Sequence, residues 1–187
     1  MIEPNKELLS KFVGFQRFMQ TDKYVSNVIV IKEKKPQHTT SLEYNEVLNC
    51  TQPFGKSYIS IEVRNGDPFN FSAKLMTDEI SNKILLRYDS AGAAHRNNIE
   101  GIPLNNQIVT TPHIHRYDNQ GRLIAEKTEA ILKNQKAASD IQTGFSIFCL
   151  EGRIKGKTIK CPQVHIGDQP VLPFEMTMID PCDGVPF

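Results

Sequence analysis

The sequence contains no tryptophan, no Cys-x-x-Cys pair and no apolar run that approaches the length of a membrane span. A helix needs about 18 or more consecutive apolar residues to cross a bilayer, so we expect no transmembrane segment. Residues 1–6 lack the basic start and apolar stretch of a secretory signal peptide. These absences favour a soluble, cytoplasmic protein that does not associate with a membrane.

The four cysteines, Cys50, Cys149, Cys161 and Cys182, are separated by wide and unrelated spacings. A chain of 187 residues can bury a self-sufficient core and does not depend on a disulfide framework as very small secreted domains do. We therefore expect free thiols, with Cys149 buried as a small apolar residue.

Charge of one sign is also missing, because 22 basic and 21 acidic residues leave a net charge of +1. No overall field therefore points to nucleic acid or a membrane surface as a partner, although a local patch can still bind one. Walker and dinucleotide-binding motifs are absent, as are internal repeats. The basic residues Arg153, Lys155 and Lys157 alternate, which favours a solvated edge strand over a nucleic-acid-binding face.

The first half of the chain predicts a helix followed by strands. Apolar residues at three- and four-residue steps predict an amphipathic helix over residues 5–20, and the β-branched segment 24–32 predicts a core strand. Residues 34–56 contain prolines, glycine and many polar residues, so we expect mostly loop, with at most a short turn or strand near residues 42–48. Alternating residues 57–64, the Asn65-Gly66 turn and alternating residues 69–75 predict a β-hairpin, and residues 83–89 a third strand.

The second half predicts two more strands, at residues 107–117 and 122–127, then a helix over residues 126–139. Residues 140–150 fit either a short helix or a strand. The expected fold class is α+β, with an N-terminal amphipathic helix, an antiparallel β-meander sheet, one or two further helices and an extended C-terminal tail. We expect residues 1–151 to form one domain and the proline-rich residues 152–187 to form a loop-rich extension packed on it.

Three of the five histidines, His95, His113 and His115, fall within residues 85–117. On a strand, residues two apart project from the same face about 6 to 7 Å apart, so His113 and His115 should stand side by side. Arg87, Arg96 and Arg116 occur in the same segment. The loop that carries His95 is free to fold over the shared face, which makes this segment the candidate site.

Three interpretations of the segment stay open. In the first, His95, His113 and His115 bind a divalent metal such as zinc, with an oxygen ligand from Asp89, Asp118 or Glu126. In the second, two of the histidines act without metal as general acid and base in RNA cleavage while Arg87, Arg96 or Arg116 holds the phosphate. In the third, these residues are structural: the two strand histidines are half-exposed polar positions, His95-Arg96-Asn97 stabilises its own loop, and Arg87 pairs locally with Asp89.

The pattern LLRYD at residues 85–89, His95-Arg96-Asn97 with Gly101, and PHIHRY at residues 112–117 resembles an uncharacterised bacterial family of small α+β proteins. The similarity extends over about residues 56–130. It implies an accessory protein of bacterial or mobile-element (phage) origin and assigns no activity.

Two function classes therefore remain. The first is an enzyme or binding protein for a phosphate-containing substrate, RNA or another nucleic acid, with His95, His113 and His115 at the reaction and Arg87, Arg96 and Arg116 at the substrate. The second is a non-enzymatic interaction or inhibitor module that binds a protein partner. A catalytic or metal site needs the three histidines to converge, whereas an interaction module tolerates them dispersed.

Overall fold

A computed structural model describes residues 3–35 and 38–167. In chain order its helices are α1 Lys6–Ser10, α2 Phe12–Gln20, the 3-10 turn η1 Leu104–Gln107, α3 Glu129–Lys133, α4 Gln135–Ala138 and α5 Ile141–Gly152. The strands are β1 Lys23–Val25, β2 Val28–Ile31, β3 Glu33–Lys35, β4 His38–Val47, β5 Asn49–Cys50, β6 Ser57–Arg64, β7 Asp67–Thr77, β8 Ser81–Asp89, β9 His95–Arg96, β10 Ile108–Val109, β11 His113–Tyr117, β12 Leu123–Glu126, β13 Ile154–Gly156 and β14 Gln163–Ile166.

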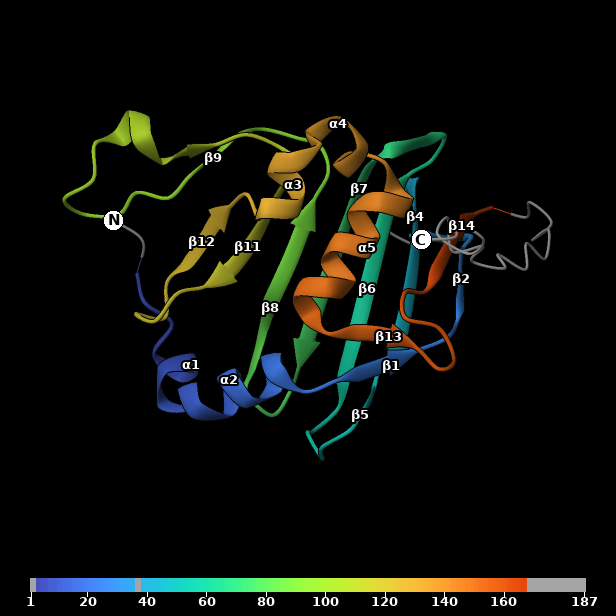
Figure 1. Ribbon diagram of the computed structural model, residues 1–187, viewed down its shortest axis with the longest axis horizontal. Helices are drawn as coiled ribbons and strands as arrows, with labels where there is room; N and C mark the ends of the chain where they lie inside the picture. Colours follow the sequence, from blue (N-terminus) through green and yellow to red (C-terminus); the bar gives the residue numbers. More distant parts are fainter. Residues whose placement is uncertain (1–2, 36–37, 168–187) are drawn as a thin grey trace, which may run out of the picture.

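Seven strands form the central antiparallel sheet, in the order β12-β11-β8-β7-β6-β4-β3. Helices α3, α4 and α5 lie together over one face of this sheet (Figure 1), with α5 against β7 and β8. Together with helices α1 and α2, the antiparallel sheet and its covering helices form the α+β architecture that the sequence predicts.

The β6–β7 hairpin forms as its sequence predicts. Buried and half-buried residues alternate along β6, and Gly66 has a φ of 78°, which suits the tight turn after Asn65. The strand register shifts just before the turn, between Val63 and Arg64. The apolar side of both strands faces the core, and its members are Ile59, Ile61, Val63, Phe71, Ala73 and Leu75.

Helix α5 resolves the ambiguity of residues 140–150 in favour of a helix. The Asp140 carboxylate accepts a hydrogen bond from the backbone N–H of Gln142 at 2.9 Å and so caps the first turn. The helix packs closely on the sheet at Gly144, where an added Cβ would lie 2.7 Å from the ring of Phe71. Tyr88 packs beside it and donates a 2.6 Å hydrogen bond to the carbonyl of Ala138.

The C-terminal extension is part of the fold as far as the structure describes it. Strand β13 pairs in parallel with β1, and β14 pairs in parallel with β2. At this junction the buried ammonium of Lys23 donates to the carbonyl oxygens of Phe18, Thr21 and Gly152. Residues 168–187, the rest of the predicted tail, lie outside the described residues.

The prediction of mostly loop over residues 34–56 is wrong in extent, although the strand expected near residues 42–48 is present. Strand β4 covers ten residues and pairs with β6 from Ser41 to Val47. Its sequence is polar because only one side, which includes Leu42, faces the core. A short strand with apolar residues only at alternate positions is difficult to recognise in a sequence when prolines and polar residues flank it.

Other predicted elements are divided in the structure. The predicted N-terminal helix breaks at Lys11 into α1 and α2, and the predicted strand at residues 24–32 is β1 and β2, which belong to different sheets. The predicted helix at residues 126–139 is α3 and α4, because Asn134 leaves the helical conformation and caps α4 with its side chain. Within the described ranges no helix has the length and apolarity to cross a membrane.

Candidate metal centre

The paired ends of β8 and β11 build the candidate site on the polar side of the sheet. In the register between these strands, His113 lies opposite Asp89 and His115 lies opposite Arg87. Directly opposed residues project from the same face of a sheet, and so do residues two apart on one strand. All four side chains therefore emerge together, on the face away from the Tyr88 side that packs against α5.

Asp89, His113 and His115 form a buried group that could hold a metal ion. The two Nε2 atoms are 2.9 Å apart. Oδ2 of Asp89 lies 3.2 Å from Nε2 of His115 and 3.6 Å from Nε2 of His113. The two histidines are only 2% and 7% exposed, so the interpretation that they are half-exposed polar positions is wrong. Three ligand-type atoms thus meet at one point that is almost closed to solvent.

The edges of this triangle match those of a coordinated ion. Donors about 2.1 Å from a metal at angles of about 90 to 110° are separated by about 3.0 to 3.4 Å. The three observed separations, 2.9, 3.2 and 3.6 Å, bracket that range. An ion placed on one side of the triangle would contact all three atoms and keep its other positions open.

A proton on each Nε2 does not satisfy the three atoms, whereas a cation can. A neutral imidazole carries one ring proton, so two neutral histidines supply at most two protons to three mutually close acceptor atoms. With both protons on Nε2, these atoms would face each other at 2.9 Å as two donors. A cation between the lone pairs of His113, His115 and Asp89 removes the conflict.

Asp89 is held as a carboxylate and oriented. Its burial favours the protonated form, but its contacts with His113 and His115 together with the Arg87 charge hold the pKa of Asp89 well below its usual range. Nε of Arg87 donates to Oδ1 at 2.7 Å, which turns Oδ2 toward the histidines. Such a partner behind a ligand fixes its geometry in metal sites.

His95 lies beside this group without belonging to it. Its ring centroid is 4.7 Å from that of His115 and 6.3 Å from that of His113, and its Nε2 is buried with no hydrogen-bond partner in the described part of the chain. Burial lowers the pKa of His95, and the neighbouring histidines lower it further, which favours the neutral ring. Nδ1 of His113 is likewise buried without a partner among the described residues.

Asn97 positions the segment that carries His95. Its side-chain amide donates to the carbonyl of Ala125 at 2.8 Å and accepts from the N–H of Ala125 at 2.7 Å. Ala125 pairs with His115 across β11 and β12. The segment that leads from β8 to β9 passes along this end of the sheet (Figure 1). The two hydrogen bonds of Asn97 attach it to β12, two residues after His95.

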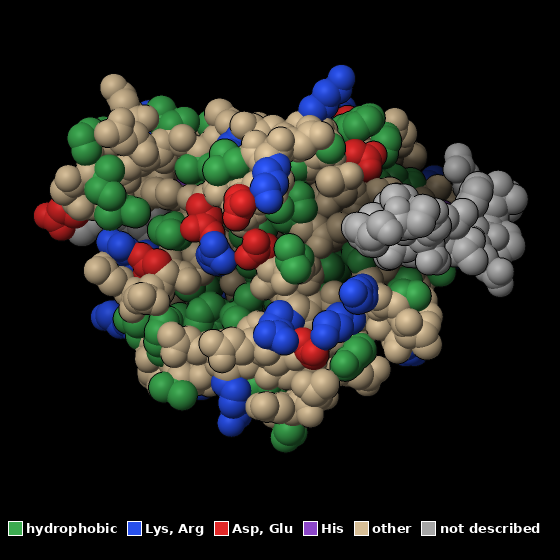
Figure 2. Space-filling model, viewed as in Figure 1, with side chains coloured by type: hydrophobic (Ala, Val, Ile, Leu, Met, Phe, Trp, Pro, Cys, Tyr) green, Lys and Arg blue, Asp and Glu red, His purple; other side chains and the backbone are tan. Residues whose placement is uncertain are grey.

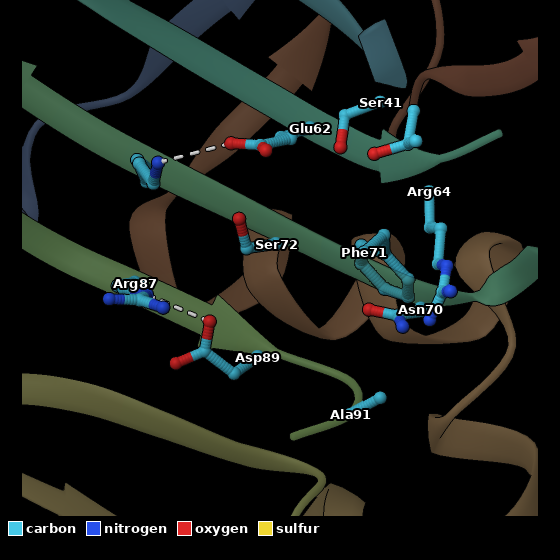
Figure 3. Close-up of a pocket in the computed structure, with 11 residues that line it drawn as sticks. Ser41, Glu62, Arg64, Asn70, Phe71, Ser72, Arg87, Asp89 and Ala91 are labelled. Atoms are coloured by element: carbon cyan, nitrogen blue, oxygen red, sulfur yellow. Dashed lines mark hydrogen bonds and ion pairs between the residues drawn. The ribbon is translucent and has the colours of Figure 1, made fainter. Parts of the chain in front are cut away.

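A cavity opens over the group of Asp89, His113 and His115, called the metal-type group below. It has a volume of about 320 Å³ and is lined by Asp89, the three histidines, Arg87, Thr111 and residues 91–94. A second hollow of about 410 Å³ shares Arg87, Asp89 and Ala91 with it. Figure 3 shows this second hollow, with Arg64 and Asn70 at the far side from Asp89. We call these two adjoining hollows the groove; the first is lined by the histidines and the second by residues of β6, β7 and β8.

The groove is polar because the strands that form it are polar on this face. Residues opposed across β6, β7, β8 and β11 form two rows, Glu62-Ser72-Asp89-His113 and Ser60-Lys74-Arg87-His115. Nζ of Lys74 lies 3.8 Å from Oε2 of Glu62, and Arg87 forms an ion pair with Asp89. The side chain of Arg87 is 43% exposed, so one of its faces is available to a ligand.

Several residues singled out in the sequence lie elsewhere. Arg116 alternates to the α5 side of β11, where it pairs with Glu126 and Glu151. Asp118 pairs with Arg122 in the turn before β12. On the face that carries α5, acidic and basic side chains are interspersed and no histidine reaches the surface in the view of Figure 2. Arg96 is exposed beside His95. Of the three proposed oxygen ligands, only Asp89 meets the histidines.

Sequence reasoning missed Lys74, Arg64 and the role of Asn97. The alternation in residues 57–64 and 69–75 carries a signal for the first two, because the polar positions of both strands must share a face. Asn97 gave no such signal, since its partner is a backbone 28 residues away.

No protein-family model, curated protein or solved structure matches this chain. The resemblance of residues 56–130 to an uncharacterised bacterial family therefore stays a prediction. The fold and site define an α+β protein with a buried two-histidine, one-aspartate group at the end of a polar groove.

Proposed function

We propose that this protein binds a divalent metal ion, zinc by its donor set, through Asp89, His113 and His115, and uses it to hydrolyse a phosphate ester of RNA or another nucleic acid. The main observation in support is the triangle formed by Nε2 of His113, Nε2 of His115 and Oδ2 of Asp89, with edges of 2.9, 3.2 and 3.6 Å. Two nitrogen ligands, one carboxylate and open remaining positions are typical of hydrolytic zinc sites.

The surroundings support hydrolysis rather than a closed structural site. A metal ion with open positions polarises a phosphoryl oxygen and lowers the pKa of bound water. The cavity of about 320 Å³ leaves room for substrate and water next to the group. Burial favours the neutral form of His95, its ring is close to His115, and its Nε2 has no hydrogen-bond partner among the described residues, so it is suited to exchange a proton with the water or the leaving oxygen.

The groove supports a phosphate-containing substrate. Arg87 lines both hollows, and Arg64 and Lys74 line the second. Their charges lie on the path to the histidines in a protein whose net charge is only +1. Guanidinium groups bind phosphate through paired N–H donors. We assign these three cations to the phosphates of the substrate.

Metal analysis of the purified protein is the first test. We expect about one zinc ion per chain, removed by a chelator and restored by titration with zinc in a calorimeter. His113→Gln and Asp89→Asn should lower the zinc affinity by at least tenfold. Arg116→Ala is the control, because Arg116 lies on the opposite face. Unchanged zinc binding in both site variants, with circular dichroism showing a folded protein, would refute the metal site.

Hydrolysis of single-stranded RNA, single-stranded DNA and a nitrophenyl phosphate ester tests the reaction. We expect zinc-dependent cleavage that His95→Gln reduces by about 100-fold, in the range of general acid–base catalysis, while zinc affinity stays within about threefold. Cleavage that persists in chelator would favour the metal-free acid–base mechanism. Zinc binding with no cleavage of any substrate would favour the interaction module. Iron in place of zinc, with oxygen consumption, would overturn hydrolysis.

A further inference from the structure

A second chemical site lies between α5 and the C-terminal extension, apart from the histidines. Cys161 follows β13 in the connection to β14, and its Sγ is 3.2 Å from Oγ of Ser146 on α5. Cys149 lies three residues further along the helix and lines the same cavity as Cys161. Residues three apart lie on the same side of a helix, so the two thiols and the hydroxyl form one cluster.

The cluster faces a large cavity. Both cysteines line a hollow of about 810 Å³ between α5 and residues 153–161. Cys161 is half-buried at its wall, and Cys149 is only 2% exposed. The basic residues Lys157 and Lys160 line the same hollow and are exposed. A small reagent can therefore reach Cys161 from solvent, while Cys149 lies behind it.

The two thiols differ in acidity. Hydrogen bonding with Cys149 and Ser146 outweighs burial and holds the pKa of Cys161 at about 6. Burial raises the pKa of Cys149 well above its usual value. At pH 7 one thiol is thus an accessible thiolate and its neighbour is a protonated, enclosed thiol. The thiolate is the nucleophilic form of cysteine.

We propose that Cys161 and Cys149 form a peroxide-reactive dithiol that closes to a disulfide between the C-terminal extension and α5. The Cys161 thiolate attacks one oxygen of hydrogen peroxide, the O–O bond breaks, and protonation of the leaving hydroxide gives water and a sulfenic acid. The Cys149 sulfur then attacks the Cys161 sulfur, the S–O bond breaks, and the thiol proton leaves with the hydroxide as a second water. Two thiols are oxidised and one peroxide is reduced.

Peptide mapping after peroxide treatment tests this assignment. One equivalent of hydrogen peroxide is added to the reduced full-length protein, remaining thiols are alkylated, and the digest is analysed without reduction. We expect a Cys149–Cys161 cross-linked peptide, with Cys50 alkylated. A cross-link of Cys161 to Cys182, or oxidation confined to Cys50, would overturn the proposal.

Variants separate the two chemical steps. Cys161→Ser should slow thiol loss by about tenfold or more, because it removes the thiolate. Cys149→Ala should let the sulfenic acid of Cys161 accumulate, as measured by its dimedone adduct. Cys50→Ser is the matched control and should react as the parent protein does, because burial raises the pKa of Cys50. Since Cys149 is buried, thermal unfolding checks that variant; Cys161→Ser reacting as fast as the parent protein contradicts the proposal regardless.

Discussion

The side-chain amide of Asn97 pairs with the backbone of Ala125 as a neighbouring strand would, through one donated and one accepted hydrogen bond. Ala125 lies in β12, an edge strand of the seven-stranded sheet, and is opposite His115 in β11. One residue thus satisfies two backbone groups of an edge and fixes His95 beside the metal-type group. The short sequence His95-Arg96-Asn97 links an acid–base candidate directly to its anchor.

Asn97→Ala should separate positioning of His95 from metal binding. Loss of both bonds leaves buried backbone groups of Ala125 unpaired, which costs about 1 to 3 kcal/mol of the free energy of unfolding. We expect zinc affinity within about threefold of the parent and cleavage reduced by about tenfold or more. Calorimetry, denaturant unfolding and the cleavage assay measure these quantities. Asn105→Ala, an exposed position in η1, is the control, and equal activities in both variants would contradict the positioning role.

Arg87→Gln tests the orientation of Asp89. Without the 2.7 Å bond to Oδ1, the carboxylate can rotate away from the histidines, and loss of such a partner lowers metal affinity by about 10- to 100-fold. Arg122→Gln breaks a comparable arginine–aspartate pair, with Asp118, in a turn away from the site. Zinc titration of both variants should show weakened binding in the first alone. Equal affinities would mean that Arg87 does not orient the ligand.

Local patterns in the sequence predicted the β6–β7 hairpin and the shared face of His113 and His115. The same alternation that places those histidines together also places Arg116 on the other face, between Glu126 and Glu151. Period-two geometry alone therefore separates Arg116 from the histidines. Closeness in sequence grouped all three arginines. The alternation of side chains along a strand is a better guide to which of them share a face with the histidines.

Long-range pairing was not predictable in this way. Asp89 meets His113 because β8 and β11 are neighbours in one register, although residues 90–112 separate them. No local signal specifies that register, since it depends on burial of Tyr88 and Ile114 in the same core. The polar strand β4 was missed for a related reason, because its pairing with β6 outweighs the weak strand preference of its own residues.

Two glycine substitutions test how closely α5 packs. A Cβ at Gly144 would lie 2.6 Å from the carbonyl oxygen of Ala138 and 2.9 Å from the ring of Tyr88. Gly144→Ala should therefore lower the free energy of unfolding by about 1 to 3 kcal/mol, the usual cost of overpacking. Gly14→Ala in α2 meets nothing within 4 Å and should raise it by about 0.5 to 1 kcal/mol. Denaturant unfolding measures the free energy of unfolding of both variants. If both substitutions change it in the same direction, the close packing of α5 does not determine the effect.

Lys23 predicts a rise of stability in alkaline solution. Its ammonium is fully buried, donates to three carbonyl oxygens and lies 4.3 Å from the centre of the Phe18 ring. Burial nevertheless lowers the pKa of Lys23 from 10.5 to about 8. Between these values the unfolded chain holds a proton that the folded protein has lost, so the free energy of unfolding increases with pH. A shift of this size corresponds to about 3 kcal/mol.

Lys23→Met isolates this contribution, because the other groups that titrate in alkaline solution are common to both proteins. The variant should be less stable at pH 7, since the carbonyls of Phe18, Thr21 and Gly152 lose their donor. From about pH 8 to 10.5 the unfolding free energy of the parent, minus that of the variant, should rise by up to about 3 kcal/mol. Lys133→Met removes an exposed lysine and serves as the control. A difference that stays flat or falls over this range would mean that the carbonyl oxygens and the Phe18 ring compensate the ammonium fully for its burial.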